Sequence, residues 1–142
     1  MKNIFAAFIV MGNVSFASAA LLETVDIQGR LMIVDQEKGK ISGIIENAEG
    51  RKKMKLTANI NGKDMSCAGA SKFIVESQLV SGYLDCGDGK TMSVILDLRN
   101  TEIIDYLQGG LASARMNVYM RDGDIGPAKS IFGGKVDIKK MN

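Results

Sequence analysis

The sequence lacks histidine and tryptophan altogether, and it has only two cysteines and one proline among its 142 residues. Without histidine, the chain cannot build the Ser-His-Asp and Cys-His systems of nucleophilic catalysis, or the imidazole ligands of zinc and copper sites. Two cysteines are too few for a thiolate zinc site, and Cys67 and Cys86 do not form the C-x-x-C motif of redox proteins. We therefore expect neither a metal nor a cofactor.

Glycine-rich phosphate-binding loops are missing as well, because neither GxxxxGK[ST] nor GxGxxG occurs in the chain. Carboxylates are the remaining candidates for catalysis, in two closely spaced pairs: Asp85 with Asp88, and Asp122 with Asp124. Two carboxyl groups about 5 to 9 Å apart can hydrolyse glycosides, but aspartate is also a residue that turns require. Both pairs fall in predicted turns. We assign no catalytic residue and keep a small carboxylate-based hydrolase as an alternative.

The chain has no large excess of either charge, since 18 lysines and arginines face 16 aspartates and glutamates. Proteins dedicated to nucleic acids normally carry a clear basic excess. The aromatic residues beyond position 20 are few and spread out, whereas surfaces for single-stranded nucleic acid interleave aromatic with basic side chains. We therefore expect no nucleic-acid partner.

The strongest positive signal lies at the N-terminus. A short segment with Lys2 precedes an unbroken apolar run over residues 4–11, and small residues gather between positions 15 and 20. This order is typical of a secretory signal peptide, and residues 17–19 fit the A-x-A rule, which places cleavage between Ala19 and Ala20. Residues 18–20 fit nearly as well, which would place the cut before Leu21. The apolar run is too short to span a hydrocarbon core of about 30 Å, and no later stretch is long enough. We predict a signal peptide over residues 1–19 and a single mainly β domain over residues 20–142, periplasmic or secreted.

In an exported chain, an even number of cysteines predicts a disulfide. A bridge between Cys67 and Cys86 would close a loop of about 20 residues and stabilise the fold by about 3 kcal/mol. The alternative is a pair of buried free thiols that pack as small apolar groups.

The clearest element is a β-hairpin from Lys53 to Cys67. Apolar and polar residues alternate on both sides of Asn61-Gly62, which suits a two-residue turn because both positions need a positive φ. Such a turn pairs Ile60 with Lys63, Ala58 with Met65, and Leu56 with Cys67. One face of the hairpin is then mostly apolar and the other polar, so the pattern and the turn predict the same register.

A second hairpin is expected from Leu79 to Leu98, around a turn at residues 87–89. A three-residue loop would pair Cys86 with Lys90 and Leu84 with Met92, whereas a five-residue loop would pair Cys86 with Met92 and Leu84 with Val94. Either loop keeps the apolar residues on one face, so the face is predicted although the register stays open. Both cysteines then lie on core faces, which makes their bridge a structural link.

Further alternating stretches predict strands near residues 25–27, 31–33, 41–45 and 115–120, and two closing strands at 130–132 and 136–138 on either side of Gly133-Gly134. One short helix is expected over residues 102–107, with Asn100 or Thr101 as its N-cap and Gly109 after its C-terminus. The methionines mostly alternate with polar residues and are interpreted as core. Seven or eight short strands with frequent turns predict an antiparallel β-sandwich or a small β-barrel.

Charged side chains at the predicted turns form the candidate binding loops. The segment from Asp122 begins like an EF-hand loop, but glycine at its fifth position and the lack of a glutamate at its twelfth exclude that motif. A calcium site shared by two loops is left as an alternative. The candidate loop residues are Asp88, Lys90, Asp122, Asp124, Arg51 and Lys52.

These observations favour an exported, non-catalytic domain that binds another envelope or extracellular macromolecule, such as a hydrolase inhibitor or an assembly or accessory protein. Binding would use exposed loops or an open sheet edge. The partner would be a protein or another envelope component, and no stable transmembrane segment is expected after cleavage. A β-barrel that carries a lipid or a small apolar ligand is the alternative from a different class.

Overall fold

The computed structural model describes residues 30–36, 39–48, 51–74, 76–123 and 126–141. These residues form eight strands and one short helix. The elements are β1 (Arg30–Asp35), β2 (Ile41–Ala48), β3 (Arg51–Ile60), β4 (Lys63–Ile74), β5 (Leu79–Gly87), β6 (Lys90–Asp97), α2 (Ile103–Leu107), β7 (Ala112–Asp122) and β8 (Lys129–Met141). The predicted signal peptide, its cleavage site and the strand predicted near residues 25–27 lie outside the described residues.

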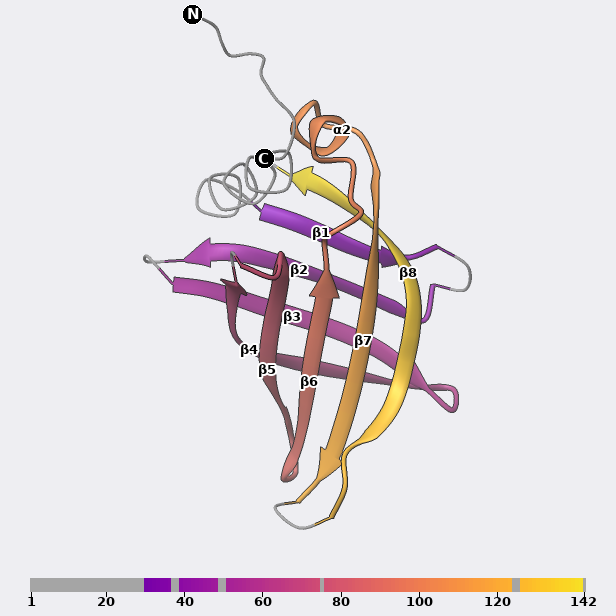
Figure 1. Cartoon of the computed structure of the whole chain (residues 1–142). Helices are drawn as coiled ribbons and strands as arrows, with labels where there is room; N and C mark the ends of the chain where they lie inside the picture. The colour runs from indigo at the N-terminus through magenta and orange to yellow at the C-terminus, as the bar shows by residue number, and fades with distance from the viewer. Residues whose placement is uncertain (1–29, 37–38, 49–50, 75, 124–125, 142) are drawn as a thin grey trace, which may run out of the picture.

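The strands form a closed barrel in which each strand is antiparallel to the next and β8 returns to pair with β1 (Figure 1). The mainly β prediction is confirmed, and of the two architectures that the sequence left open the barrel is the one formed. Closure has a direct consequence for recognition. Strands β1–β8 leave no open sheet edge, so the expectation of binding by strand addition was wrong for this part of the chain.

Alternate residues of every strand point into the barrel, where they form one apolar cluster. An eight-stranded barrel is just wide enough for side chains to fill its interior. Ile103 and Tyr106 of α2 add to the same cluster. The inward side chains with no accessible surface are Ile33, Met54, Leu84, Met92, Val94, Leu96, Met116, Val118, Val136 and Ile138. A lumen that held a ligand would leave the side chains around it accessible, so the interior along these residues is filled.

The hairpin of β3 and β4 has the predicted register, with Ile60 opposite Lys63 and Leu56 opposite Cys67. Its turn residues Asn61 and Gly62 have φ values of 54° and 81°, as a two-residue turn of this type requires. The register therefore follows from local sequence alone.

In the hairpin of β5 and β6, Leu84 pairs with Met92 on the core face, which is one of the two registers considered. The loop itself differs from both expectations, because Gly87 pairs with Lys90 and the turn has only two residues, Asp88 and Gly89. Both have positive φ, at 53° and 75°. The additional residue lies in a bulge between Asp85 and Gly87, and a bulge shifts the pairing by one without turning the strand over.

Two other local predictions were wrong. The closing strands predicted around Gly133-Gly134 are one continuous strand, β8, because these glycines pair with Asn117 and Met116 of β7 and keep the ladder intact. The helix begins after Glu102, which makes no side-chain capping bond, so neither of the predicted caps is used. Gly109 does follow the helix with a φ of 86°, as predicted.

Candidate functional site: an apolar groove on the outer face of the barrel

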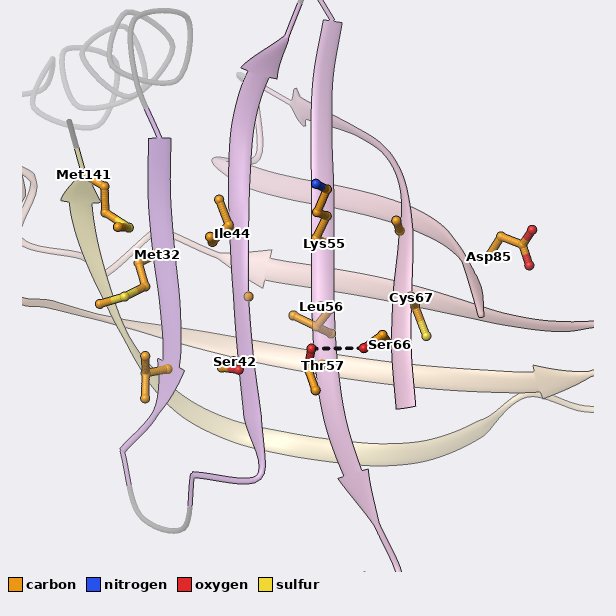
Figure 2. A pocket seen from close by; sticks show the side chains of 13 residues that line it. Met32, Ser42, Ile44, Lys55, Leu56, Thr57, Ser66, Cys67, Asp85 and Met141 are labelled. Atoms are coloured by element: carbon orange, nitrogen blue, oxygen red, sulfur yellow. Dashed lines mark hydrogen bonds between the residues drawn. The ribbon is translucent and has the colours of Figure 1, made fainter. Parts of the chain in front are cut away.

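A pocket of about 500 Å³ lies on the outer face of strands β1–β5, next to the end of β8 (Figure 2). We call it the outer groove. It is lined by Met32, Val34, Ser42, Gly43, Ile44, Lys55, Leu56, Thr57, Ser66, Cys67, Ala68, Asp85 and Met141. Most of these residues point away from the core, because they alternate with the buried residues of their strands.

One half of the outer groove is apolar. Met32 and Val34 alternate with the buried Leu31 and Ile33 along β1, and Ile44 lies directly opposite Met32 on β2. Met141 contributes from β8 and is half-buried, as Met32, Val34 and Ile44 are. The outer face of an antiparallel sheet is usually polar, so these side chains form an apolar surface where water normally covers the strands.

The other half of the groove offers hydrogen-bonding groups. Ser42, Thr57 and Ser66 stand in one row across β2, β3 and β4, and the hydroxyls of Thr57 and Ser66 are 3.4 Å apart, within hydrogen-bonding distance. Each hydroxyl oxygen has further capacity, because a hydroxyl can donate once and accept twice. An occupant of the groove can therefore meet apolar surface and polar groups side by side.

Charged groups stand along the same row of the sheet as the apolar half. Lys55 follows Ile44 in the register, its side chain is 64% exposed, and its ammonium lies 3.9 Å from Glu46 Oε1. Glu46 Oε2 also lies 3.6 Å from Arg30 Nε, so the Glu46 carboxylate interacts with both Lys55 and Arg30. Lys139 stands directly opposite Met32 and is exposed. Cations thus stand on both sides of Met32 and Ile44.

The floor of the groove depends on a glycine. Gly43 lies opposite Leu56, and a Cβ at position 43 would come within 2.6 Å of Leu56 Cδ1 and 2.7 Å of the Lys55 carbonyl oxygen. Any larger residue would force the two strands or the Leu56 side chain to move. Glycine therefore lets Leu56 close the barrel wall beneath the groove.

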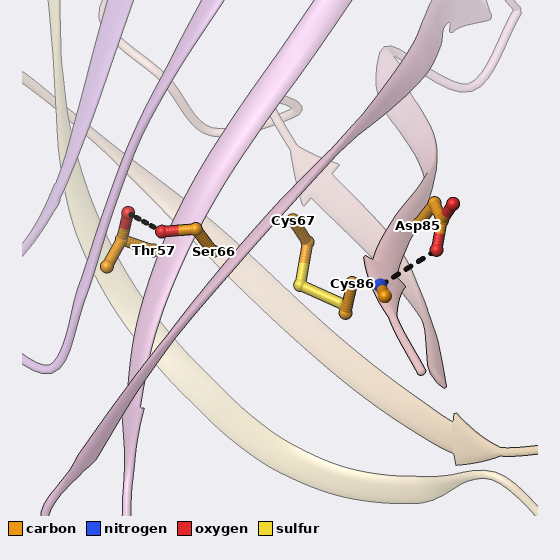
Figure 3. The surroundings of a disulfide bond; sticks show 6 residues. Thr57, Ser66, Cys67, Asp85 and Cys86 are labelled. Atoms are coloured by element: carbon orange, nitrogen blue, oxygen red, sulfur yellow. Dashed lines mark hydrogen bonds between the residues drawn. A yellow bond between two sulfur atoms is a disulfide. The ribbon is translucent and has the colours of Figure 1, made fainter. Parts of the chain in front are cut away.

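The disulfide between Cys67 and Cys86 joins β4 to β5 beside the polar half of the groove (Figure 3). The predicted bridge is confirmed, with a Cα–Cα distance of 4.2 Å. Cys67 is 3% exposed, whereas Cys86 lies at the bulge and is half-buried, so the bridge is less enclosed than expected. Next to it, Asp85 Oδ1 accepts a hydrogen bond from the Gly87 N–H at 2.9 Å. Asp85 thus stabilises the bulged turn and also lines the groove.

The candidate loop residues do not line the outer groove. Lys90 and Asp122 face each other across β6 and β7, and the Gly123 N–H donates to the Gly89 carbonyl at 2.9 Å, which joins the two loops at one end of the barrel. Asp88 is in the same β5–β6 turn. Arg51 and Lys52 lie apart from them at the start of β3. Asp124 lies outside the described residues.

Sequence reasoning missed the outer groove because it interpreted the methionines as core. That is right for Met54, Met92 and Met116, but wrong for Met32 and Met141, which line the groove outside the barrel. The available signal was the run Leu31-Met32-Ile33-Val34, in which apolar residues occupy both faces of one strand.

The described residues include no group of three or more His, Cys, Asp or Glu side chains that could hold a metal ion. In the same part of the chain, no helix has the length and hydropathy that a membrane crossing needs. Comparisons with known protein families, with curated protein sequences and with solved structures find no match to this chain.

Proposed function

We propose that the protein is an exported, non-catalytic binding domain that holds a segment of another envelope or extracellular protein in the outer groove. The observation that carries this proposal is an apolar groove on the outside of a barrel whose interior is filled along the inward strands. An exposed apolar surface of this kind marks a binding site more often than a structural one.

The lining of the groove favours a peptide segment as its occupant. Apolar side chains of a partner would contact Met32, Ile44 and Met141, and methionine adapts its shape to irregular apolar surfaces. Backbone amides of the same segment could form hydrogen bonds with the row of hydroxyls at Ser42, Thr57 and Ser66. An acyl chain has no groups that could form these bonds. The cations Lys55 and Lys139 favour an acidic residue beside the apolar ones.

Export is part of this proposal, with residues 1–19 as a signal peptide and a periplasmic or secreted mature protein. The disulfide between Cys67 and Cys86 supports it, because such bonds persist in oxidising compartments. We expect the protein recovered from the periplasm to have an intact mass that lacks residues 1–19, and to resist alkylation until it is reduced. Recovery of the uncleaved chain with two alkylated thiols would contradict export.

The groove itself is tested with phage-displayed peptides selected on the purified protein. We expect the selected sequences to combine apolar residues with an adjacent acidic residue. Ile44→Glu should weaken binding of a synthetic peptide on the order of tenfold or more, because it places a carboxylate on the apolar half of the groove. The measurement is a calorimetric titration of wild-type and variant protein with the same peptide.

Ile95→Glu is the matched control. Ile95 is also half-buried and outward-facing, but it stands on β6 between Ser81 and Asn117, away from the groove. It should leave peptide affinity unchanged, and both variants should keep the disulfide and the far-ultraviolet spectrum of the wild type. Lys55→Glu should weaken the binding of peptides with an acidic residue. It should leave unchanged the binding of the same peptides in which Asn or Gln replaces that residue. Equal losses from Ile44→Glu and Ile95→Glu, or selected peptides without apolar residues, would reject the groove as the site. Binding of acyl chains in place of peptides would reject the peptide as occupant.

A further inference from the structure

A second pocket, of about 410 Å³, lies outside the barrel where β6 leads into the segment before α2. It is separate from the outer groove and shares no residue with it. We call it the polar pocket. It is lined by Asp97, Asn100, Thr101, Ser113, Ala114, Arg115 and Lys135. Two cations, two hydroxyls and an amide are therefore brought together from β7, β8 and the segment after β6.

The two cations are placed directly against each other. Arg115 on β7 pairs in register with Lys135 on β8, and both side chains are exposed on the outer face. Like charges that lie directly opposite on one face of a sheet destabilise it. Neither side chain forms a hydrogen bond or an ion pair with any described residue, so their repulsion is offset only by longer-range attraction, which includes that between Arg115 and Asp97.

The neighbouring carboxylate offsets their charge only in part. Asp97 lies opposite Arg115 in the register of β6 and β7, but its oxygens are bound by Arg99. Arg99 Nη2 is 2.6 Å from Asp97 Oδ2, and Arg99 Nε is 3.0 Å from Oδ1. This hydrogen bonding holds the pKa of Asp97 below its usual value, so the carboxylate stays ionised and paired with Arg99. Asp97 also attracts Arg115, through a weaker coulombic interaction, and the two cations still leave the lining of the pocket with net positive charge.

A hydroxyl in the same lining is also without a partner. Thr101 Oγ1 is buried and has no hydrogen-bond partner among the described residues. Leaving a buried hydroxyl unpaired costs free energy, which a bound acceptor would recover. Two independent features, a pair of directly opposed cations and an unpaired hydroxyl, thus occur in one pocket.

We propose that the polar pocket binds a phosphate group. Arg115 and Lys135 supply charge and several N–H donors. Thr101 and Ser113 supply hydroxyls, and the Ser113 hydroxyl, which accepts a hydrogen bond from Gln36 Nε2 at 3.3 Å, can still donate. These donors suit an oxyanion with several acceptor oxygens. A volume of about 410 Å³ exceeds what the phosphate itself needs, so it leaves room for part of the molecule that carries it. The same chemistry is offered by free phosphate, by a phosphorylated sugar and by a phospholipid headgroup.

The test uses inorganic phosphate as the probe and the thermal midpoint of purified protein as the readout. Phosphate raises the midpoint of most proteins through general exclusion from their surface, and specific binding adds a saturable rise. We expect wild type to show the saturable rise and Arg115→Gln to lose it. Lys129→Gln removes the same charge from an exposed position on β8 outside the pocket, and it should behave as wild type.

Two further variants separate binding from folding. Lys135→Gln should raise the midpoint in phosphate-free buffer, because it removes the repulsion from Arg115, and it should weaken phosphate binding at least fivefold. Thr101→Val keeps the side-chain shape, so it should leave the midpoint unchanged or higher without phosphate and still weaken phosphate binding severalfold. A thermal rise that is the same in wild type, Arg115→Gln and Lys129→Gln would overturn the proposal. So would acetate binding as tightly as phosphate.

The source of the phosphate is decided with vesicles. Flotation with phosphatidylglycerol vesicles that depends on Arg115 and not on Lys129 would assign the pocket to a lipid headgroup. Saturable binding of inorganic phosphate without flotation would assign it to a soluble phosphate compound. Both results support the pocket, whereas flotation that is lost equally in the Arg115 and Lys129 variants would show a general charge effect and overturn it.

Discussion

Replacing Tyr106 with alanine is expected to lower the free energy of unfolding by about 3–5 kcal/mol, the range found when a large buried ring is removed from a core. Tyr106 is 1% exposed and is among the largest fully buried side chains. Tyr106 belongs to the apolar core cluster. The helix that carries it, α2, lies at the end of the barrel where β6 ends and β7 begins (Figure 1). A helix of five residues without a side-chain N-cap cannot hold itself together. The ring therefore stabilises α2 as well as the core.

The measurement is urea unfolding followed by far-ultraviolet circular dichroism, since the chain has no tryptophan to report by fluorescence. Ile104→Ala is the matched control in the same helix. Ile104 is 58% exposed, so its truncation should change the free energy by no more than about 0.5 kcal/mol. Tyr106→Phe keeps the ring and separates its packing from its hydroxyl. If Tyr106→Ala costs no more than Ile104→Ala, then the Tyr106 ring does not stabilise the core as described.

Predictions from the sequence were confirmed where the structure depends on contacts between residues close together in the chain. The β3–β4 register follows from a two-residue turn and the alternation beside it, and both lie within fifteen residues of chain. The β5–β6 hairpin shows the limit of this reasoning. The inward face of Leu84 and Met92 was predictable, but the bulge at Cys86 was not, because a bulge keeps the alternation while it changes the loop length.

Closure of the barrel could not be predicted, because β1 pairs with β8 across almost the whole described chain. Both pockets depend on such pairings. The outer groove exists because Met32 and Ile44 on neighbouring strands meet Met141 from the other end of the chain. The polar pocket exists because β7 and β8 pair Arg115 with Lys135, a register that includes a shift between Val118 and Tyr119. The candidate loops were predicted from charged residues at turns, and this criterion did not identify either pocket.

Loss of the disulfide is expected to lower the free energy of unfolding by about 3 kcal/mol without loss of the fold. The bridge spans 19 positions of sequence, so in the unfolded chain it restricts a short loop. The ladder from β4 to β5 continues beyond it from Ala68–Asp85 to Ile74–Leu79, so hydrogen bonding can keep the two strands paired. We expect Cys67→Ala/Cys86→Ala to keep the far-ultraviolet spectrum and to unfold at lower urea concentration.

Chemical reduction of the wild type is the control, because it breaks the bridge and keeps both sulfur atoms in place. Reduction should lower the free energy of unfolding by nearly the same amount as the double variant. A larger decrease in the variant would measure the packing of the buried Cys67 side chain. Ser66, Ala68 and Asp85 of the outer groove stand beside the bridge, so peptide binding should weaken as well, by less than Ile44→Glu weakens it. An unfolding curve that does not move on reduction would show that the barrel does not depend on this bridge for stability.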